Sequence, residues 1–236
     1  MGKTECRARR GAFIVAMVAV SAGASNSPDA TDRVDPDTFA DDGVAAVLWS
    51  QVDDDSFTAY PSQNFERSFD VYDCQAADDF VVPKGEAWSV RKVRVEGVYG
   101  NGGGVAASEN VTFYRSAGGA PGEEIASYPG LVGAPEGIYG ASFLISLPRP
   151  VKLEAGRYWV SVQVNLDFTG GNLWHWELRA TQVGRLAMWR NPGDGFGTGC
   201  TTYQPESTCL AFEGGPDHMF ELLGKRKAGA NASAPR

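Results

Sequence analysis

The sequence is poor in the residues that metal and nucleophile chemistry usually requires. Among 236 residues there are two histidines, His175 and His218, and four cysteines. They show neither a His-x-x-x-His nor a Cys-x-x-Cys spacing, which disfavours a zinc site. A Gly-x-Ser-x-Gly nucleophile elbow is missing, and the glycines of 195–199 lack the spacing and context of a dinucleotide fingerprint. We therefore expect His175 and His218 to be ordinary polar or partly buried side chains.

Long apolar runs are missing after residue 20, and none reaches the roughly 20 residues that span a bilayer, so no membrane span is expected. The first 24 residues have a different pattern. A basic start is followed by the apolar segment 12–20 and by Ala22-Gly-Ala24, a small-residue cleavage pattern. We predict a signal peptide over residues 1–24 and a secreted or periplasmic protein.

Positive charge is also scarce. There are 21 Lys and Arg against 29 Asp and Glu, which gives a formal net charge of −8. Loss of residues 1–24, with four basic and one acidic side chain, would bring it to −11. Such a chain repels nucleic acid, so cations or neutral polymers are the expected partners. Residues 25–43 are predicted to be an acidic flexible leader, and residues 225–236 a basic disordered tail.

Three cysteines remain after the predicted signal peptide, an odd number for an oxidising compartment. Cys200 and Cys209 bracket a short polar loop, and their disulfide is the first choice. A bond from Cys74 to either of them is the alternative. A leftover Cys74 is expected to be an inert or partly buried thiol.

Helical periodicity is absent, whereas strand patterns are frequent. From Tyr158 to Val164 apolar residues alternate with Trp159, Ser161 and Gln163, a period of two that predicts a strand with one face in a core. About ten such antiparallel strands, separated by turns rich in glycine and proline, predict an all-β domain over residues 44–224, a single β-sandwich or jelly roll. We expect Phe143, Ile145 and Leu147 to face Tyr158–Val164 across its core.

Four phrases of the sequence carry a family resemblance: Ala76-Ala-Asp-Asp-Phe-Val-Val-Pro83, Asn110-Val-Thr-Phe-Tyr114, Gly156-Arg-Tyr-Trp-Val-Ser-Val-Gln163 and Trp189-Arg-Asn-Pro192. In these phrases the chain resembles a family of exported bacterial β-sandwich proteins. The resemblance implies a fold and a compartment, and no catalytic residue is carried over from it.

A non-catalytic binding or surface-interaction module is the function that the sequence favours, with carbohydrate or a surface protein as the partner. Aromatic side chains on a sandwich can stack on sugar rings. Trp159, on the polar face of its strand, and the nearby Gln163 are the candidate ligand-binding residues, whereas Trp174 and Trp176 are assigned to the core. The alternatives are a secreted hydrolase of glycans, with carboxylates brought together from distant strands, and a structural envelope protein.

Clustered carboxylates suggest one cofactor, calcium, which takes six to eight oxygen ligands. Asp53, Asp54 and Asp55 form the candidate site, with Asp78 or Asp79 as further ligands. An EF-hand spacing is absent, and a solvated acidic turn is the competing interpretation.

Overall fold

The computed structural model describes residues 45–100, 103–210 and 214–228. These residues form a single all-β domain with sixteen strands in three sheets, one 3-10 helix and one short α-helix. The predicted fold class is confirmed, although the strands are more numerous than the ten expected. The predicted signal peptide, the predicted leader and residues 229–236 of the predicted tail lie outside the described residues.

The first sheet has five strands, in the order β1-β16-β5-β10-β9. Their bounds are Ala46–Ser50 for β1, Phe220–Ala228 for β16, Glu86–Val95 for β5, Ser142–Leu153 for β10 and Ala134–Glu136 for β9. All pairs in this sheet are antiparallel. Because β16 runs to Ala228 beside β5, residues 225–228 belong to the sheet and not to the predicted disordered tail.

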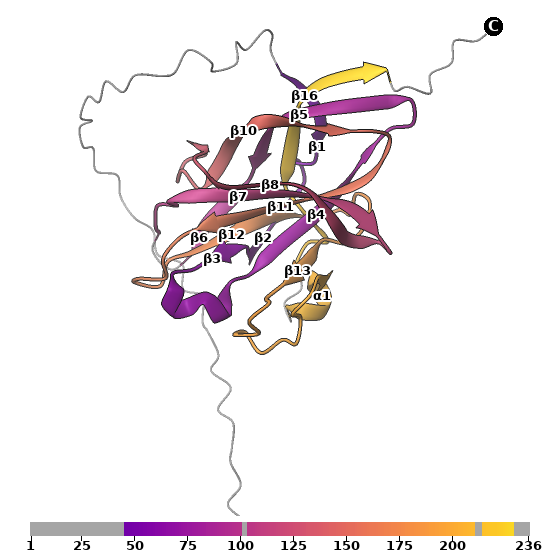
Figure 1. Cartoon of the computed structure of the whole chain (residues 1–236). Coiled ribbons are helices and arrows are strands. Elements are labelled where there is room, and N and C mark those ends of the chain that lie inside the picture. The colour runs from indigo at the N-terminus through magenta and orange to yellow at the C-terminus, as the bar shows by residue number, and fades with distance from the viewer. Residues whose placement is uncertain (1–44, 101–102, 211–213, 229–236) are drawn as a thin grey trace, which may run out of the picture.

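The second sheet has seven strands, with β14-β13-β4-β11-β7-β8 in order and β3 parallel to the end of β11. Their bounds are Gln204–Pro205 for β14, Met188–Arg190 for β13, Gln75–Val82 for β4, Gly156–Asn165 for β11, Ser108–Ala117 for β7, Ala120–Leu131 for β8 and Gln63–Asn64 for β3. The first sheet lies over the layer of β4, β11, β7 and β8 (Figure 1).

A smaller third sheet is built around β12 (Leu173–Arg179), which pairs with β2 (Asp55–Pro61), β6 (Gly97–Gly100) and β15 (Asp217–His218). Two helices complete the fold: η1 (Arg67–Tyr72) between β3 and β4, and α1 (Glu206–Cys209) after β14. No helix among the described residues is long and apolar enough to cross a membrane.

The main core lies between the first two sheets, as the alternation along residues 158–164 predicts. Tyr158, Val160, Val162 and Val164 of β11 share one buried cluster with Phe143, Ile145 and Leu147 of β10. Trp174 and Trp176 of β12 belong to the same cluster, as expected. The facing of β10 and β11 across this core is therefore confirmed.

The opposite face of β11 is buried as well, which the alternating pattern does not predict. Trp159 packs there against Ala77, Tyr114 and Met188, with Tyr203 beside them. Met188 lies in β13 and Tyr203 just before β14, so this cover comes from residues some 30 to 45 positions further along the chain. In Figure 1, β13 and α1 lie on the side of the second sheet away from the first sheet.

Candidate functional site

The two predicted ligand-binding residues are not at the surface. Trp159 is 0% exposed and Gln163 is 7% exposed. The Trp159 indole donates to Ser116 Oγ at 3.2 Å, and the Gln163 amide donates to the carbonyl of Cys74 at 3.0 Å. Their expected exposure is wrong, because a distant segment covers this face of β11. Neither side chain offers a face on which a sugar ring could stack.

The side chains of two of the three aspartates proposed for calcium have separate partners. Asp53 Oδ1 lies 3.1 Å from a guanidinium nitrogen of Arg179, and Asp55 Oδ1 accepts the amide of Phe57 at 2.7 Å. Asp54 occupies a left-handed turn with φ 66°. Asp78 and Asp79 are buried elsewhere, in β4. Among the described residues, no group of three or more His, Cys, Asp or Glu side chains is arranged to hold a metal ion. Calcium at Asp53–Asp55 and the competing solvated acidic turn both stay predictions.

The first-choice disulfide is confirmed: Cys200 and Cys209 are bonded, with their Cα atoms 5.8 Å apart. Cys74 is a buried free thiol whose Sγ donates to the carbonyl of Pro61 at 3.5 Å. Burial raises the pKa of this thiol to about 12, which makes it a poor nucleophile.

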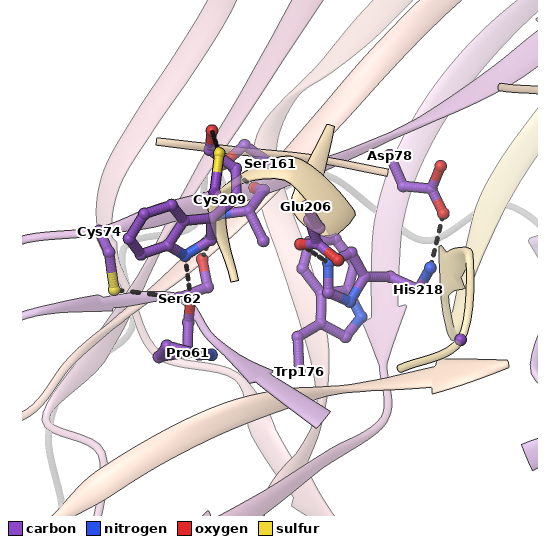
Figure 2. Close-up of polar contacts among 12 residues, drawn as sticks. Pro61, Ser62, Cys74, Asp78, Ser161, Trp176, Glu206, Cys209 and His218 are labelled. Carbon is purple, nitrogen blue, oxygen red and sulfur yellow. Dashed lines mark hydrogen bonds and ion pairs between the residues drawn. The ribbon is translucent and has the colours of Figure 1, made fainter. Parts of the chain in front are cut away.

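A buried acidic cluster, formed by Asp78, Glu206, Asp217 and His218, lies where β4, α1 and β15 meet. His218 Nε2 and Glu206 Oε1 are 2.7 Å apart, and the His218 ring stacks on Trp176 with a centroid distance of 4.4 Å (Figure 2). Asp78 Oδ2 accepts the backbone amide of His218 at 2.7 Å. His218 is thus a fully buried, partnered histidine rather than a ligand spaced for metal.

The surroundings of the buried acidic cluster raise the pKa values of two of its carboxyl groups. Burial, together with the charge of Asp217, raises the pKa of Asp78 well above its usual value. Burial also raises the pKa of Asp217 to about 6, although the amide of Val183 and the charge of His218 oppose the shift. Glu206 Oε2, Asp217 Oδ1 and His218 Nδ1 have no hydrogen-bond partner among the described residues. The cluster can hold protons near neutral pH, but it presents no accessible face to a polymer.

Asp79, the neighbour of Asp78, points to the opposite side of β4, as expected for adjacent strand residues. Its buried carboxylate forms an ion pair with the partly exposed Arg157 and accepts the amide of Arg185 at 2.7 Å. Asp78 and Asp79 therefore cannot act as a facing pair of carboxylates, in agreement with the sequence argument against that pair.

Exposed aromatic side chains gather instead where η1 meets the glycine-rich loop 191–199. Val71, Tyr72 and Phe196 are 44%, 36% and 41% exposed, and the rings of Tyr72 and Phe196 are in edge contact with centroids 5.4 Å apart. We call Tyr72 and Phe196, with the aliphatic Val71 beside them, the aromatic surface. Phe196 also contacts the buried Trp189, and Tyr72 contacts Phe69, so both rings are anchored to the interior.

Loop 191–199 is fixed by hydrogen bonds from one side chain. The buried Asn191 amide donates to the carbonyls of Val71 and Asp73, both at 2.8 Å, and its oxygen accepts the amide of Phe196 at 3.1 Å. The Gly195 amide adds a bond to the carbonyl of Val71 at 2.9 Å. A Cβ atom at Gly195 would lie 2.6 Å from that oxygen, so only glycine permits this approach.

The disulfide strengthens this arrangement, because Cys200 follows the loop directly and its carbonyl accepts the amide of Asn191 at 2.8 Å. The loop is therefore tied to η1 by Asn191 and to α1 by the Cys200–Cys209 bond. Two sequence features mark this region: the glycine spacing of residues 191–199 and the cysteine pair. Neither indicates that Tyr72, some 120 positions earlier in the chain, completes the surface.

Comparisons with known proteins add little. No family model matches the chain, and no curated protein matches it. One solved structure that it resembles is the crystal structure of the cysteine protease and lectin-like domains of Cwp84, a surface layer associated protein of Clostridium difficile. The identity is 15%, the TM-score is 0.36, and the match covers 66% of this chain and 32% of that chain. The chain thus spans about a third of that structure.

Proposed function

We propose that the protein is an exported, non-catalytic module that binds carbohydrate through the aromatic surface. The observation that carries this proposal is the pair of partly exposed rings, Tyr72 of η1 and Phe196 of loop 191–199, at a junction whose backbone is fixed before any ligand arrives. Sugar rings bind aromatic side chains through their apolar C–H faces, and rigid aromatic residues lose little entropy on binding.

Polar groups beside the aromatic surface suit the hydroxyls of a sugar. Asp70 in η1 and Asp194 in loop 191–199 are both exposed, one on each side of the junction. Asp194 is held in a left-handed turn with φ 52°, and its Oδ1 accepts the Gly199 amide at 2.8 Å. Carboxylate oxygens accept hydrogen bonds from hydroxyl groups, which adds orientation to the stacking contact.

The disulfide supports the export part of the proposal, since disulfides persist in oxidising compartments. The buried acidic cluster supports the non-catalytic part. Its residues are at most 3% exposed, so a glycan cannot reach these carboxylates as a hydrolase mechanism requires.

A glycan array probed with the purified protein tests the proposal, followed by titration of any glycan that binds. Tyr72→Ala is expected to weaken binding about two- to twelve-fold, because an aromatic contact contributes roughly 0.5–1.5 kcal/mol. Tyr139→Ala is the matched control, since Tyr139 is 81% exposed in the loop between β9 and β10 and should not affect binding.

Asn191→Ala tests whether the fixed loop matters. It removes the hydrogen bonds to Val71, Asp73 and Phe196 while keeping both rings, so it is expected to weaken binding with little change in the glycans selected. A blank array, or equal losses for Tyr72→Ala and Tyr139→Ala, would move the preferred function to protein interaction.

A further inference from the structure

The lysines of this acidic protein are not scattered. The sequence has six, and the five within the described residues all lie on the first sheet or on the turn that leads into it: Lys84, Lys92, Lys152, Lys225 and Lys227. The other two sheets contain none. Such sorting is invisible in the net charge of −8.

Strand register puts four of these lysines on the outer side of the first sheet. Trp88, Val90 and Val93 of β5 point into the core, so the intervening Ser89 and Lys92 point outward. Ser89 is paired with Lys152 of β10 on one side and with Lys225 of β16 on the other. These three side chains therefore form one row across the face.

The remaining positions extend this row along the strands. Lys227 pairs with Ala87, two residues beyond Lys225 on β16, and Lys92 pairs with Ser146 and Leu223. With strands about 4.8 Å apart and about 3.4 Å per residue, neighbouring lysines on this grid start from backbones roughly 7 to 10 Å apart. We call Lys92, Lys152, Lys225 and Lys227 the lysine face.

Acidic side chains on the same sheet are already engaged. Glu136 and Glu221 both pair with Arg94, and Glu86 accepts the indole N–H of Trp88 at 2.7 Å. The rest of the outer side near the lysines consists of small or neutral residues, Ala87, Ser89 and Ser146 among them. The five strands of this sheet carry eight Lys and Arg against three Glu, so the sheet is positive although the whole chain is negative.

We propose that the lysine face is a second binding surface, which takes an anionic polysaccharide bearing carboxylate or sulfate groups. Its flat grid of ammonium groups suits anionic groups spread along a flexible chain. The face has no exposed aromatic ring on which a base could stack, a feature that nucleic-acid surfaces commonly use. The proposal is independent of the aromatic surface, which lies at the junction of η1 and loop 191–199.

Binding of polygalacturonate, an unbranched carboxylate polysaccharide, tests this inference. The wild-type protein should bind it at low salt, with affinity falling steeply between 20 and 200 mM NaCl, and should not bind dextran through this face. Lys152→Gln combined with Lys227→Gln should weaken binding about ten-fold; both side chains are exposed, so the fold should persist. Unchanged thermal melting of this variant would confirm that persistence.

The matched control changes the net charge equally elsewhere. Arg115→Gln with Arg185→Gln removes two exposed cations outside the first sheet, and binding should stay within about two-fold of wild type. Equal losses in both double variants would overturn the proposal, as would tighter binding of duplex DNA or of anionic vesicles than of polygalacturonate. Binding that appears only in the double variant Asp41→Asn, Asp42→Asn would also overturn the proposal. The occupant of the lysine face would then be the chain's own acidic segment, which precedes β1 in the sequence.

Discussion

Replacing Asp217 with asparagine is expected to flatten the pH dependence of stability. Burial raises the pKa of Asp217 from 3.8 to about 6, so the folded protein holds a proton that the unfolded chain releases between these values. Stability from this group is therefore fully present below about pH 3.8 and is lost as the pH rises through about 6. A shift of about two pKa units corresponds to about 3 kcal/mol. Asp78, whose pKa is also raised, acts in the same direction.

Urea unfolding at pH 4, 5, 6 and 7 measures this effect. The free energy of unfolding of the wild type, relative to Asp217→Asn, should fall by about 2.5 kcal/mol across the series, because a small part of the loss is already complete at pH 4. Asparagine keeps an oxygen that can accept the amide of Val183, so the variant should fold. Asp70→Asn, at an exposed position in η1, serves as the control and should follow the wild type. If Asp217→Asn also follows the wild type at every pH, the assigned burial of this carboxyl is wrong.

Three further outcomes are expected. Replacing Cys200 and Cys209 together by serine should lower the free energy of unfolding by about 2.5 kcal/mol, the entropy of closing a loop with a separation of nine residues, and an unchanged urea midpoint would refute it. Trp159→Ala should cost about 3–5 kcal/mol by the same assay, since the side chain is fully buried; a loss under 1 kcal/mol would mean that it is exposed in solution. Removal of calcium with EDTA should leave the melting temperature unchanged, given the separate partners of Asp53 and Asp55, and a fall of several degrees would establish the calcium site.

Most of the fold could be predicted from local sequence patterns. The alternation from Tyr158 to Val164 and the pairing of Phe143, Ile145 and Leu147 against it follow from the period of a strand and from the need of its apolar face for a partner. The Cys200–Cys209 bond could likewise be favoured from proximity in sequence. Strands of two or three residues, such as β9 and β14, have too few positions to show a period and were missed.

The exposure expected of Trp159 and Gln163 is wrong for a reason specific to β11. Alternation of Tyr158 with Trp159 and Ser161 indicates one apolar and one mixed face, and a mixed face normally meets solvent. Here Met188 and Tyr203 cover it, and Trp159, Ser161 and Gln163 make their polar contacts inside the protein. No local signal in residues 156–165 could reveal a cover that comes from another part of the chain.

Net charge hides a local arrangement for a similar reason. A formal net charge treats every ionised group alike, whereas the strand register gathers Lys152, Lys225 and Lys227 on one side of a sheet. The expectation of cations or neutral polymers as partners stays a prediction drawn from the average charge, and the proposal for the lysine face departs from it on this side of the sheet. These lysines come from two distant segments, residues 150–153 and 224–228, which both pair with the strand that contains Ser89. Their proximity is therefore not visible in the sequence.

Burial of β11 on both faces has a consequence for measurements on this protein. The strand is hydrogen-bonded to β4 and β7 on its two sides, and Tyr158 to Val164 are all buried. Its amide protons should exchange with solvent only when the whole domain opens, and not through local fraying. The slowest-exchanging amides of β11 would then report the total free energy of folding, so binding at a remote surface could be read as slower exchange at a strand that no ligand touches.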